Sequence, residues 1–280
     1  MQNIHAHFWD YGIHYGDLAK LESIKSRGFE LDLSVTLDKL VEDSRPFEKV
    51  VIFGLKAKKL DEWVPDQYIA DIIKTAPDKF YGFACCDPTQ PNYMEELIYA
   101  FQTLHLSGLK MLPVYAGFDP RDPKCDPVYQ YCQKYSIPIL FHSGTTYNHE
   151  AVLGYSRPWL FDEIAIRYPD LKIVLAHMGH PWTEECIAVI RKHKNMYADI
   201  SALYYRPWQF YNTMIAIQEY KVADKILFGT DYPFACGNES ISGFKNVNKI
   251  ISDSGLPKVS EDFINEVLDR DSFTLLNIRK

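Results

Sequence analysis

Short apolar runs alternate with longer amphipathic segments along most of this chain. Runs rich in β-branched and aromatic residues predict eight strands, at residues 3–8, 49–54, 80–86, 108–113, 138–142, 172–177, 196–201 and 225–230. Within these runs apolar residues are nearly continuous, which is typical of parallel strands covered on both faces. Amphipathic patterns predict helices between them, for example at residues 91–104, 126–135 and 158–168.

Eight strand–helix alternations predict an α/β fold, a (β/α)₈ TIM barrel in which residues 1–280 form a single domain. A doubly wound open sheet is the alternative fold with the same alternation. No long linker, internal repeat or low-complexity segment interrupts the pattern. Residues 9–48 depart from it, since 16–30 and 36–45 both have helical patterns. We interpret this stretch as a small helical elaboration between strands one and two.

The composition is that of a globular domain, with 47% hydrophobic and 24% charged residues. The net charge is −7 and no Lys/Arg run is present, so we expect neither nucleic acid nor a membrane as a partner. No apolar stretch approaches the length of a membrane span, and the N-terminus lacks the pattern of a signal peptide. We therefore expect a cytoplasmic protein with a small-molecule substrate. Aromatic residues near Trp159 and Trp208 make a homodimer plausible.

The six cysteines form no C-x-x-C pair. In a cytoplasmic chain of this size we expect reduced, mostly buried thiols. We do not expect Cys236, which follows the eighth strand, to act as a nucleophile.

Histidines gather where the predicted strands end. His5 and His7 are two residues apart on strand one, so both side chains leave the same face of that strand. His142 ends strand five, His177 ends strand six, and Asp231 follows strand eight. Any one of these residues could be structural: a histidine pair on an edge strand, a core histidine, or an aspartate in a turn. Together they lie at the carboxyl ends of barrel strands, where active sites of such barrels are built.

Neutral imidazoles and a carboxylate suit Zn²⁺ and also accept Mn²⁺, Fe²⁺ or Co²⁺. We expect His5, His7, His142 and Asp231 to hold one such ion, most simply Zn²⁺, with a position left for water. An ion of this kind lowers the pKa of bound water from about 16 to about 7. Asp231 could then shuttle the proton of the water, and His177 could hydrogen-bond the water or a developing oxyanion.

The motifs HAH, LFHSGTT, LAHMGHPW and LFGTDYP resemble those of the amidohydrolase superfamily. The resemblance is to its amidohydrolase-related branch, which includes aminocarboxymuconate-semialdehyde decarboxylase. The segments GLKMLPVYAGFDPRDP, RPWLFDEIAIRYPDLKIVLAHMG and NMYADIS match as well, so the resemblance covers essentially the whole chain. It implies a metal-dependent barrel enzyme with His5, His7, His142 and Asp231 as ligands and His177 as a catalytic partner.

Three further residues have open roles. Lys110, on strand four, is structural, lines the substrate pocket or, as in binuclear members of the superfamily, is carboxylated and bridges two metals, with His177 on the second ion. The match to the mononuclear branch favours one metal. Arg157 could bind a substrate carboxylate in a bidentate manner or form a surface salt bridge. Asp199, on strand seven, could belong to the barrel wall or orient a liganding histidine.

Three functions are compatible with these residues. The first is hydrolysis of an amide, lactone or ester carbonyl through metal-activated water. The alternative is non-oxidative decarboxylation of an unsaturated or aromatic acid, which needs a cation such as Arg157, Arg206 or Lys110 near the substrate carboxylate. A pair of basic side chains facing the metal across the pocket would favour the decarboxylase. A carboxylated Lys110 that binds two ions would favour the hydrolase. The third is a barrel that binds a metal without catalysis.

Overall fold

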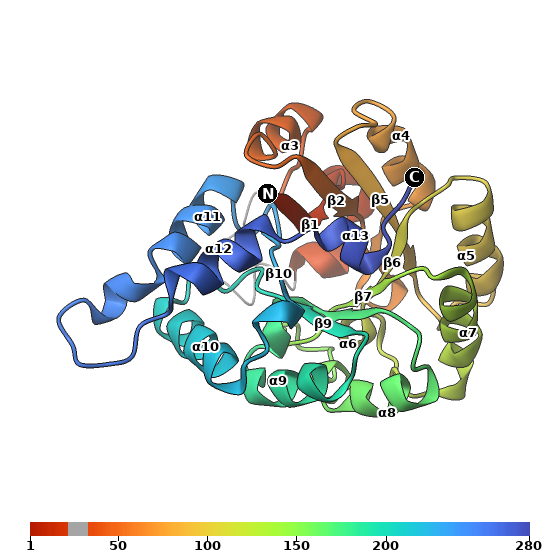
Figure 1. The fold of residues 1–280 in the computed structure, drawn as a ribbon. Helices are drawn as coiled ribbons and strands as arrows, with labels where there is room; N and C mark the ends of the chain where they lie inside the picture. Colours follow the sequence, from red (N-terminus) through yellow and green to blue (C-terminus); the bar gives the residue numbers. More distant parts are fainter. Residues whose placement is uncertain (22–32) are drawn as a thin grey trace.

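Eight strands of this protein form one ring-like parallel sheet, shown in a computed structural model that describes residues 1–21 and 33–280 (Figure 1). The sheet contains β1 (Gln2–His7), β2 (Lys49–Phe53), β5 (Phe80–Cys86), β6 (Gly108–Met111), β7 (Ile139–Phe141), β8 (Ile173–Leu175), β9 (Met196–Asp199) and β10 (Ile226–Leu227). Their order in the sheet is their order in the chain, and every neighbouring pair is parallel. The predicted barrel is therefore confirmed, and the open doubly wound sheet is wrong.

Backbone hydrogen bonds between β1 and the segment around β10 bring the two ends of the sheet together. The N–H of Ile4 donates to the carbonyl of Phe228 at 3.1 Å. The N–H groups of Thr230 and Asp231 donate to the carbonyl of His5 at 3.2 and 2.9 Å. The same contacts that close the ring thus place Asp231 beside His5.

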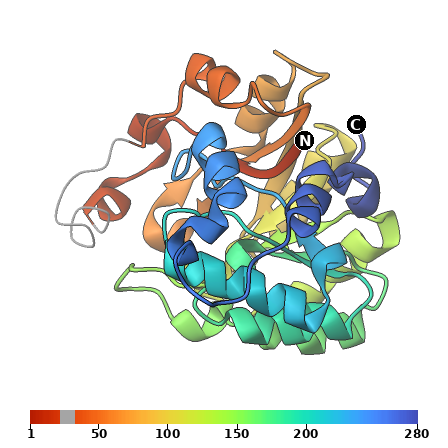
Figure 2. The same cartoon turned by 60° about the vertical axis from the view of Figure 1, so that its left-hand side comes forward.

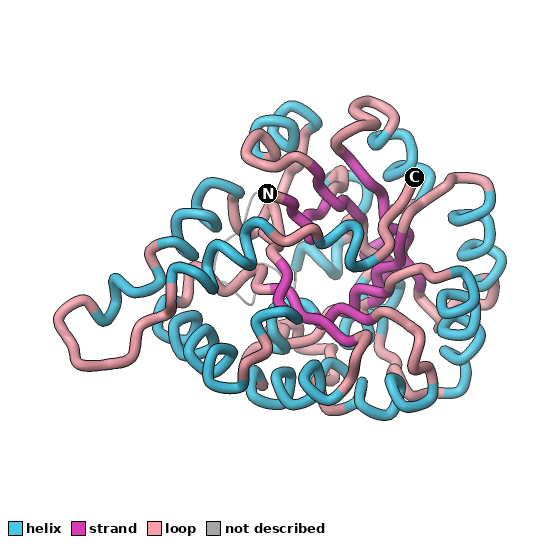
Figure 3. Tube along the Cα trace, viewed as in Figure 1, coloured by secondary structure: helices cyan, strands magenta, loops and turns pink. Residues whose placement is uncertain are grey.

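Most helices surround the strands on the outside, as Figure 3 and the turned view in Figure 2 show, whereas the last one lies across one end of the barrel. They are α1 (Tyr11–His14), α3 (Leu37–Asp43), α4 (Asp66–Ile73), α5 (Tyr93–Gln102), α6 (Pro113–Ala116), α7 (Asp126–Tyr135), α8 (Leu160–Arg167), α9 (Thr183–Lys192), α10 (Pro207–Tyr220), α11 (Gly237–Lys245), α12 (Glu261–Asp269) and α13 (Ser272–Leu276). Short 3₁₀ helices are η1 (Lys58–Leu60), η2 (Pro123–Cys125), η3 (Leu153–Ser156), η4 (Ala176–Gly179), η5 (Ala223–Lys225) and η6 (Val247–Ile251). None of the described helices has both the length and the apolar composition that crossing a bilayer requires.

Alternate strand residues fill two separate apolar layers. Val51, Leu140 and Val174 belong to the cluster inside the barrel, whereas their neighbours pack outward against the helices. Phe273 of α13 joins the inner cluster, and its N–H donates to the side chain of Gln2 at the start of β1. Helix α13 therefore closes the amino-terminal end of the barrel, which leaves the carboxyl-terminal end for a functional site.

The predicted elements differ from the observed ones mainly at their ends. The helix predicted at 126–135 is α7 with the same bounds, and α5 and α8 lie within the helices predicted at 91–104 and 158–168. The strands predicted at 138–142, 172–177 and 225–230 are shorter than expected, since β7, β8 and β10 end at Phe141, Leu175 and Leu227.

The elaboration after β1 is described in part. Helix α3 lies within the predicted segment 36–45 and begins after Thr36, whose hydroxyl accepts the N–H of Lys39 at 3.3 Å. The predicted segment 16–30 extends into residues that lie outside the described ranges. A small hairpin of β3 (Lys56–Ala57) and β4 (Glu62–Trp63) follows β2 and was not predicted. All six cysteines are free, as expected, and Cys236 alone among them is exposed.

Candidate metal centre

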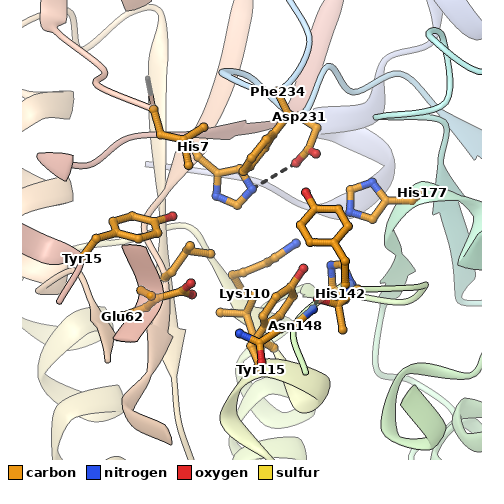
Figure 4. Close-up of a pocket in the computed structure, with 16 residues that line it drawn as sticks. His7, Tyr15, Glu62, Lys110, Tyr115, His142, Asn148, His177, Asp231 and Phe234 are labelled. Atoms are coloured by element: carbon orange, nitrogen blue, oxygen red, sulfur yellow. Dashed lines mark hydrogen bonds and ion pairs between the residues drawn. The ribbon is translucent and has the colours of Figure 1, made fainter. Parts of the chain in front are cut away.

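His5 and His7 project from β1 toward the same carboxylate. The Nε2 atom of each ring lies 3.1 Å from Oδ1 of Asp231, and the two ring centroids are 5.3 Å apart. Figure 4 shows His7 and Asp231 facing each other at the top of the pocket. Gly229, two residues before Asp231, permits this approach, because a Cβ there would lie 2.7 Å from the Cβ of His5.

His142 and His177 complete the cluster from neighbouring strands. His142 follows β7 directly, and its N–H continues the sheet by donating to the carbonyl of Met111 at 2.8 Å. The ring of His177 lies 5.0 Å from that of His5 and 5.1 Å from that of His142, measured between centroids. His177 and Asp231 both have left-handed backbones, with φ of 57° and 69°. Such unfavourable conformations in non-glycine residues are concentrated at functional sites.

Asp199 fixes the orientation of His5 from behind. Its Oδ2 accepts a hydrogen bond from Nδ1 of His5 at 2.8 Å, which is the orienting role considered from the sequence. Its Oδ1 accepts the N–H groups of His177 and Ser201, both at 3.0 Å, and the hydroxyl of Ser201. With the ring proton on Nδ1, the neutral His5 keeps an unprotonated Nε2 directed at Asp231.

The cluster has the donor atoms of a metal site. His5, His177 and Asp231 each offer one ligand atom, and these atoms lie within 4.8 Å of one another. The unprotonated Nε2 of His5 faces a carboxylate oxygen, an arrangement of two acceptors that a cation between them would satisfy. Among the described residues, Nδ1 of His7 and Nε2 of His142 are buried without a hydrogen-bond partner. Nitrogen and carboxylate donors of this kind fit a borderline divalent ion.

The protonation states also suit metal binding. Burial lowers the pKa of His7 to about 3 and that of His177 to about 4, and it lowers the pKa of His142 well below its usual value. Burial alone would raise the pKa of Asp231, but the neighbouring imidazoles of His177, His5 and His7 bring it well below the usual range. Neutral imidazoles and an ionised carboxylate are the forms that bind metals.

The two residues proposed for substrate binding lie in different places. Lys110 is buried, with its Nζ 3.4 Å from Nε2 of His5 and 4.8 Å from the ring centroid of Phe53. Burial lowers its pKa to about 8. Arg157 is exposed and pairs with Glu185, and it does not line the pockets described below. Its position corresponds to the surface salt bridge that was the alternative interpretation.

A pocket opens beside the cluster and contains several residues that the sequence did not single out. Its empty volume is about 730 Å³, including the open mouth. The residues that line it beyond the cluster and Lys110 include Tyr15, Leu55, Glu62, Leu112, Tyr115, Asn148 and Phe234. They come from loops, from helix α6 and from the small hairpin; Leu112 and Tyr115 lie within the matching segment GLKMLPVYAGFDPRDP, but that segment did not single them out as pocket residues. An adjoining cavity shares His142, His177 and Asp231 and includes Arg206.

Comparison with models of known protein families identifies the family to which this barrel belongs. The model of the amidohydrolase family matches residues 3–264, so the chain belongs to this family of metal-dependent enzymes. The resemblance described from the motifs is thereby confirmed. A comparison with curated protein sequences gives no match.

Solved structures share the fold at low sequence identity. An uncharacterised TIM-barrel protein from Bordetella bronchiseptica is 21% identical, with a TM-score of 0.75 and 99% of each chain covered. A probable 2-pyrone-4,6-dicarboxylic acid hydrolase from Acinetobacter baumannii, with citric acid bound, is 14% identical, with a TM-score of 0.71 and 99% of each chain covered. A dihydroxybenzoic acid decarboxylase from Polaromonas sp. JS666, with manganese and the inhibitor 2-nitroresorcinol, is 18% identical, with a TM-score of 0.63. That alignment covers 99% of this chain and 96% of the decarboxylase.

Proposed function

We propose that this protein is a metal-dependent hydrolase that acts on the carbonyl group of a small-molecule amide, lactone or ester. The observation that carries the proposal is the convergence of His7, His142, His177 and Asp231 on one pocket at the carboxyl ends of the barrel strands, with the buried His5 next to Asp231 and His177. A hydrolase of the same fold, the probable pyrone dicarboxylic acid hydrolase, supports the reaction class.

The metal is proposed to be one divalent ion held by His5, His7, His142 and Asp231, with His177 beside it. Zn²⁺ suits this donor set best, and Mn²⁺, Fe²⁺ or Co²⁺ would also fit it. When bound, such an ion polarises a carbonyl oxygen and lowers the pKa of water. If Lys110 is carboxylated, a second ion could bind with His177 as a ligand.

The residues of the chain then have separate tasks. Asp231 is ionised and takes the proton of the attacking water, which it returns to the leaving group. The Ser201 hydroxyl lies 2.8 Å from Nδ1 of His177 and holds the ring in place. The other ring nitrogen, Nε2, is then left for the substrate oxygen. The apolar side chains of Leu55, Leu112 and Phe234 keep the pocket poor in water, which strengthens these interactions.

The charges around the pocket favour hydrolysis over decarboxylation. A decarboxylase would be expected to present a basic pair across from the metal. Among the described residues of this pocket, Lys110 is the one cation, and it lies on the side of the cluster. A carboxyl group, Glu62, faces the cluster instead (Figure 4).

Decarboxylation remains the second candidate because of Arg206. This residue borders the adjoining cavity, which shares His142, His177 and Asp231 with the main pocket. Its Nη1 donates to the carbonyl of Ala202 at 2.7 Å, which holds the guanidinium near the cluster. A substrate carboxylate in that cavity would find a cation there, and the manganese-containing decarboxylase has the same fold.

Three further properties belong to the proposal. The partner is a small-molecule substrate and not nucleic acid or a membrane, the location is the cytoplasm, and the protein forms a homodimer. The homodimer is proposed because Trp159 and Trp208 are large apolar side chains with exposed fractions of 64% and 53%.

The proposed reaction is tested by turnover of the purified, metal-loaded protein. A panel of lactones, amides and esters is assayed for hydrolysis, and a panel of aromatic and enoic acids is assayed for release of CO₂. We expect hydrolysis of at least one carbonyl class and its loss in Asp231→Asn. The matched control is Asp224→Asn, which changes an exposed carboxylate in η5, before β10. Release of CO₂ without hydrolysis would replace the hydrolase with the decarboxylase, and inactivity on both panels would contradict both.

A further inference from the structure

Glu62 is a carboxyl group built into the pocket wall away from the metal ligands. It lies on β4, where its backbone pairs with Ala57 of β3 and also forms a bridge with Tyr15. The N–H of Gly16 donates to the carbonyl of Asp61 at 2.8 Å, next to this bridge. Backbone contacts on two sides therefore fix the position of Glu62. Figure 4 shows its side chain beside Tyr15, on the side of the pocket opposite His142 and His177.

The carboxyl group of Glu62 lacks a compensating partner. Within the described part of the chain its oxygens form no ion pair or hydrogen bond, since Lys56 of the same hairpin pairs with Asp66 and Glu96 instead. Burial alone raises its pKa to about 8. Glu62 is half-buried and lines the pocket, so its carboxyl group faces the pocket without being paired inside the protein. A cationic group of a bound substrate could therefore pair with it.

Among the described residues of the pocket, no cationic side chain is available to pair with Glu62. Lys110, the one cation among the described residues of the pocket, directs its Nζ to His5 and to the ring of Phe53. The other residues near this side are apolar or neutral, including Tyr15, Leu55 and Leu112. A cationic group entering this end would therefore meet one carboxyl group on a largely apolar wall.

We propose that Glu62 selects substrates that carry an amino group at the end remote from the reacting carbonyl. The substrate class is then a small carbonyl compound with an apolar body and a protonated amine. The ammonium group would take Glu62 as its ion-pair partner, and the apolar body would pack against Leu55 and Leu112. An anionic group at that end would be rejected by the carboxyl group and by the apolar wall. The orientation of the carbonyl toward the cluster rests on the proposed hydrolase function.

A pair of non-reacting probes tests the selection without requiring turnover. Binding of 2-phenylethylammonium and of 2-phenylethanol to the metal-loaded protein is measured by titration calorimetry at pH 9, above the pKa of Glu62, where the carboxyl group is ionised and the amine is still largely protonated. The two molecules share the ring and the chain length and differ in the charged group. We expect the ammonium probe to bind roughly tenfold or more tightly than the alcohol, as a charge-assisted hydrogen bond in a desolvated pocket implies.

Glu62→Gln supplies the decisive variant, since it keeps the shape of the side chain and removes its charge. In this variant we expect the preference for the ammonium probe to disappear while the affinity for the alcohol stays within about twofold. Glu219→Gln, which changes an exposed carboxylate on α10, should keep the preference. Equal binding of both probes to the wild type, no binding of the ammonium probe, or a preference that survives Glu62→Gln would each overturn the proposal. Failure of the hydrolase assay would leave these binding results intact, so the two ideas fail separately.

Discussion

Replacing Asp199 with asparagine probes how the fold prepares His5 for a metal. The substitution keeps the size of the side chain, and the remaining oxygen can still accept the N–H groups of His177 and Ser201. The amide nitrogen then takes the place of Oδ2 and faces Nδ1 of His5, where it can donate but not accept. The ring proton of His5 must therefore move to Nε2, the atom that is directed at Asp231.

The expected loss follows from this change of tautomer. Orienting partners of metal-bound histidines are each worth about 10- to 100-fold in metal affinity, or about 1.4–2.7 kcal/mol. We expect Asp199→Asn to lie within this range, because one ligand nitrogen is blocked while the backbone contacts of Asp199 persist. The fold should remain, since the two N–H groups keep their acceptor.

The assay is competition for Zn²⁺ against a chelator of known affinity, with the wild type and Asp224→Asn as references. Thermal unfolding of the metal-free proteins checks that Asp199→Asn remains folded. A folded variant with unchanged zinc affinity would refute the reasoning, because it would show that the hydrogen bond to Nδ1 does not determine which nitrogen of His5 is available.

Two other perturbations separate roles within the pocket. His142→Ala should lose both bound metal and turnover, whereas His177→Ala should lose turnover and keep the ion. Metal content and activity are measured on the same preparations. A metal-free His177→Ala protein would show that His177 is itself a required ligand, since its ring nitrogen lies close to the ligand atoms of His5 and Asp231. For Glu62, burial raises the folded-state pKa from 4.5 to about 8, so the folded protein keeps a proton that the unfolded chain releases between these values. The stabilising contribution of the protonated group is complete below about pH 4.5 and is lost as the pH rises through about 8. The free energy of unfolding of the wild type, relative to Glu62→Gln, should therefore decline over this range in denaturant titrations, and a difference that does not vary with pH would contradict the raised pKa of Glu62.

The barrel could be predicted because its strands have a simple sequence signature. Strands buried on both faces read as continuous apolar runs, and the polar residue that ends such a run must lie at the rim. His142 and His177 follow β7 and β8 in this way, and Asp231 follows β10 after a short connection. The candidate cluster could therefore be assembled from the sequence before any contact was known.

Other parts of the site depend on contacts that no local pattern encodes. The strands β3 and β4 have two residues each, too few to show any periodicity, so Glu62 gave no signal as a pocket residue. The closeness of His177 to His5 depends on its left-handed backbone and on its N–H bond to Asp199. Arg157 precedes a proline in a loop, and its pairing with Glu185 of α9 is a tertiary contact.

We propose that distant segments of the chain converge on a single divalent cation, and metal analysis of the purified protein tests this most directly. Elemental analysis combined with protein quantification should give close to one divalent ion per chain, and His5→Ala should reduce this value to near zero. A wild-type protein that retains no divalent ion, and takes up none at stoichiometric concentrations, would contradict the account.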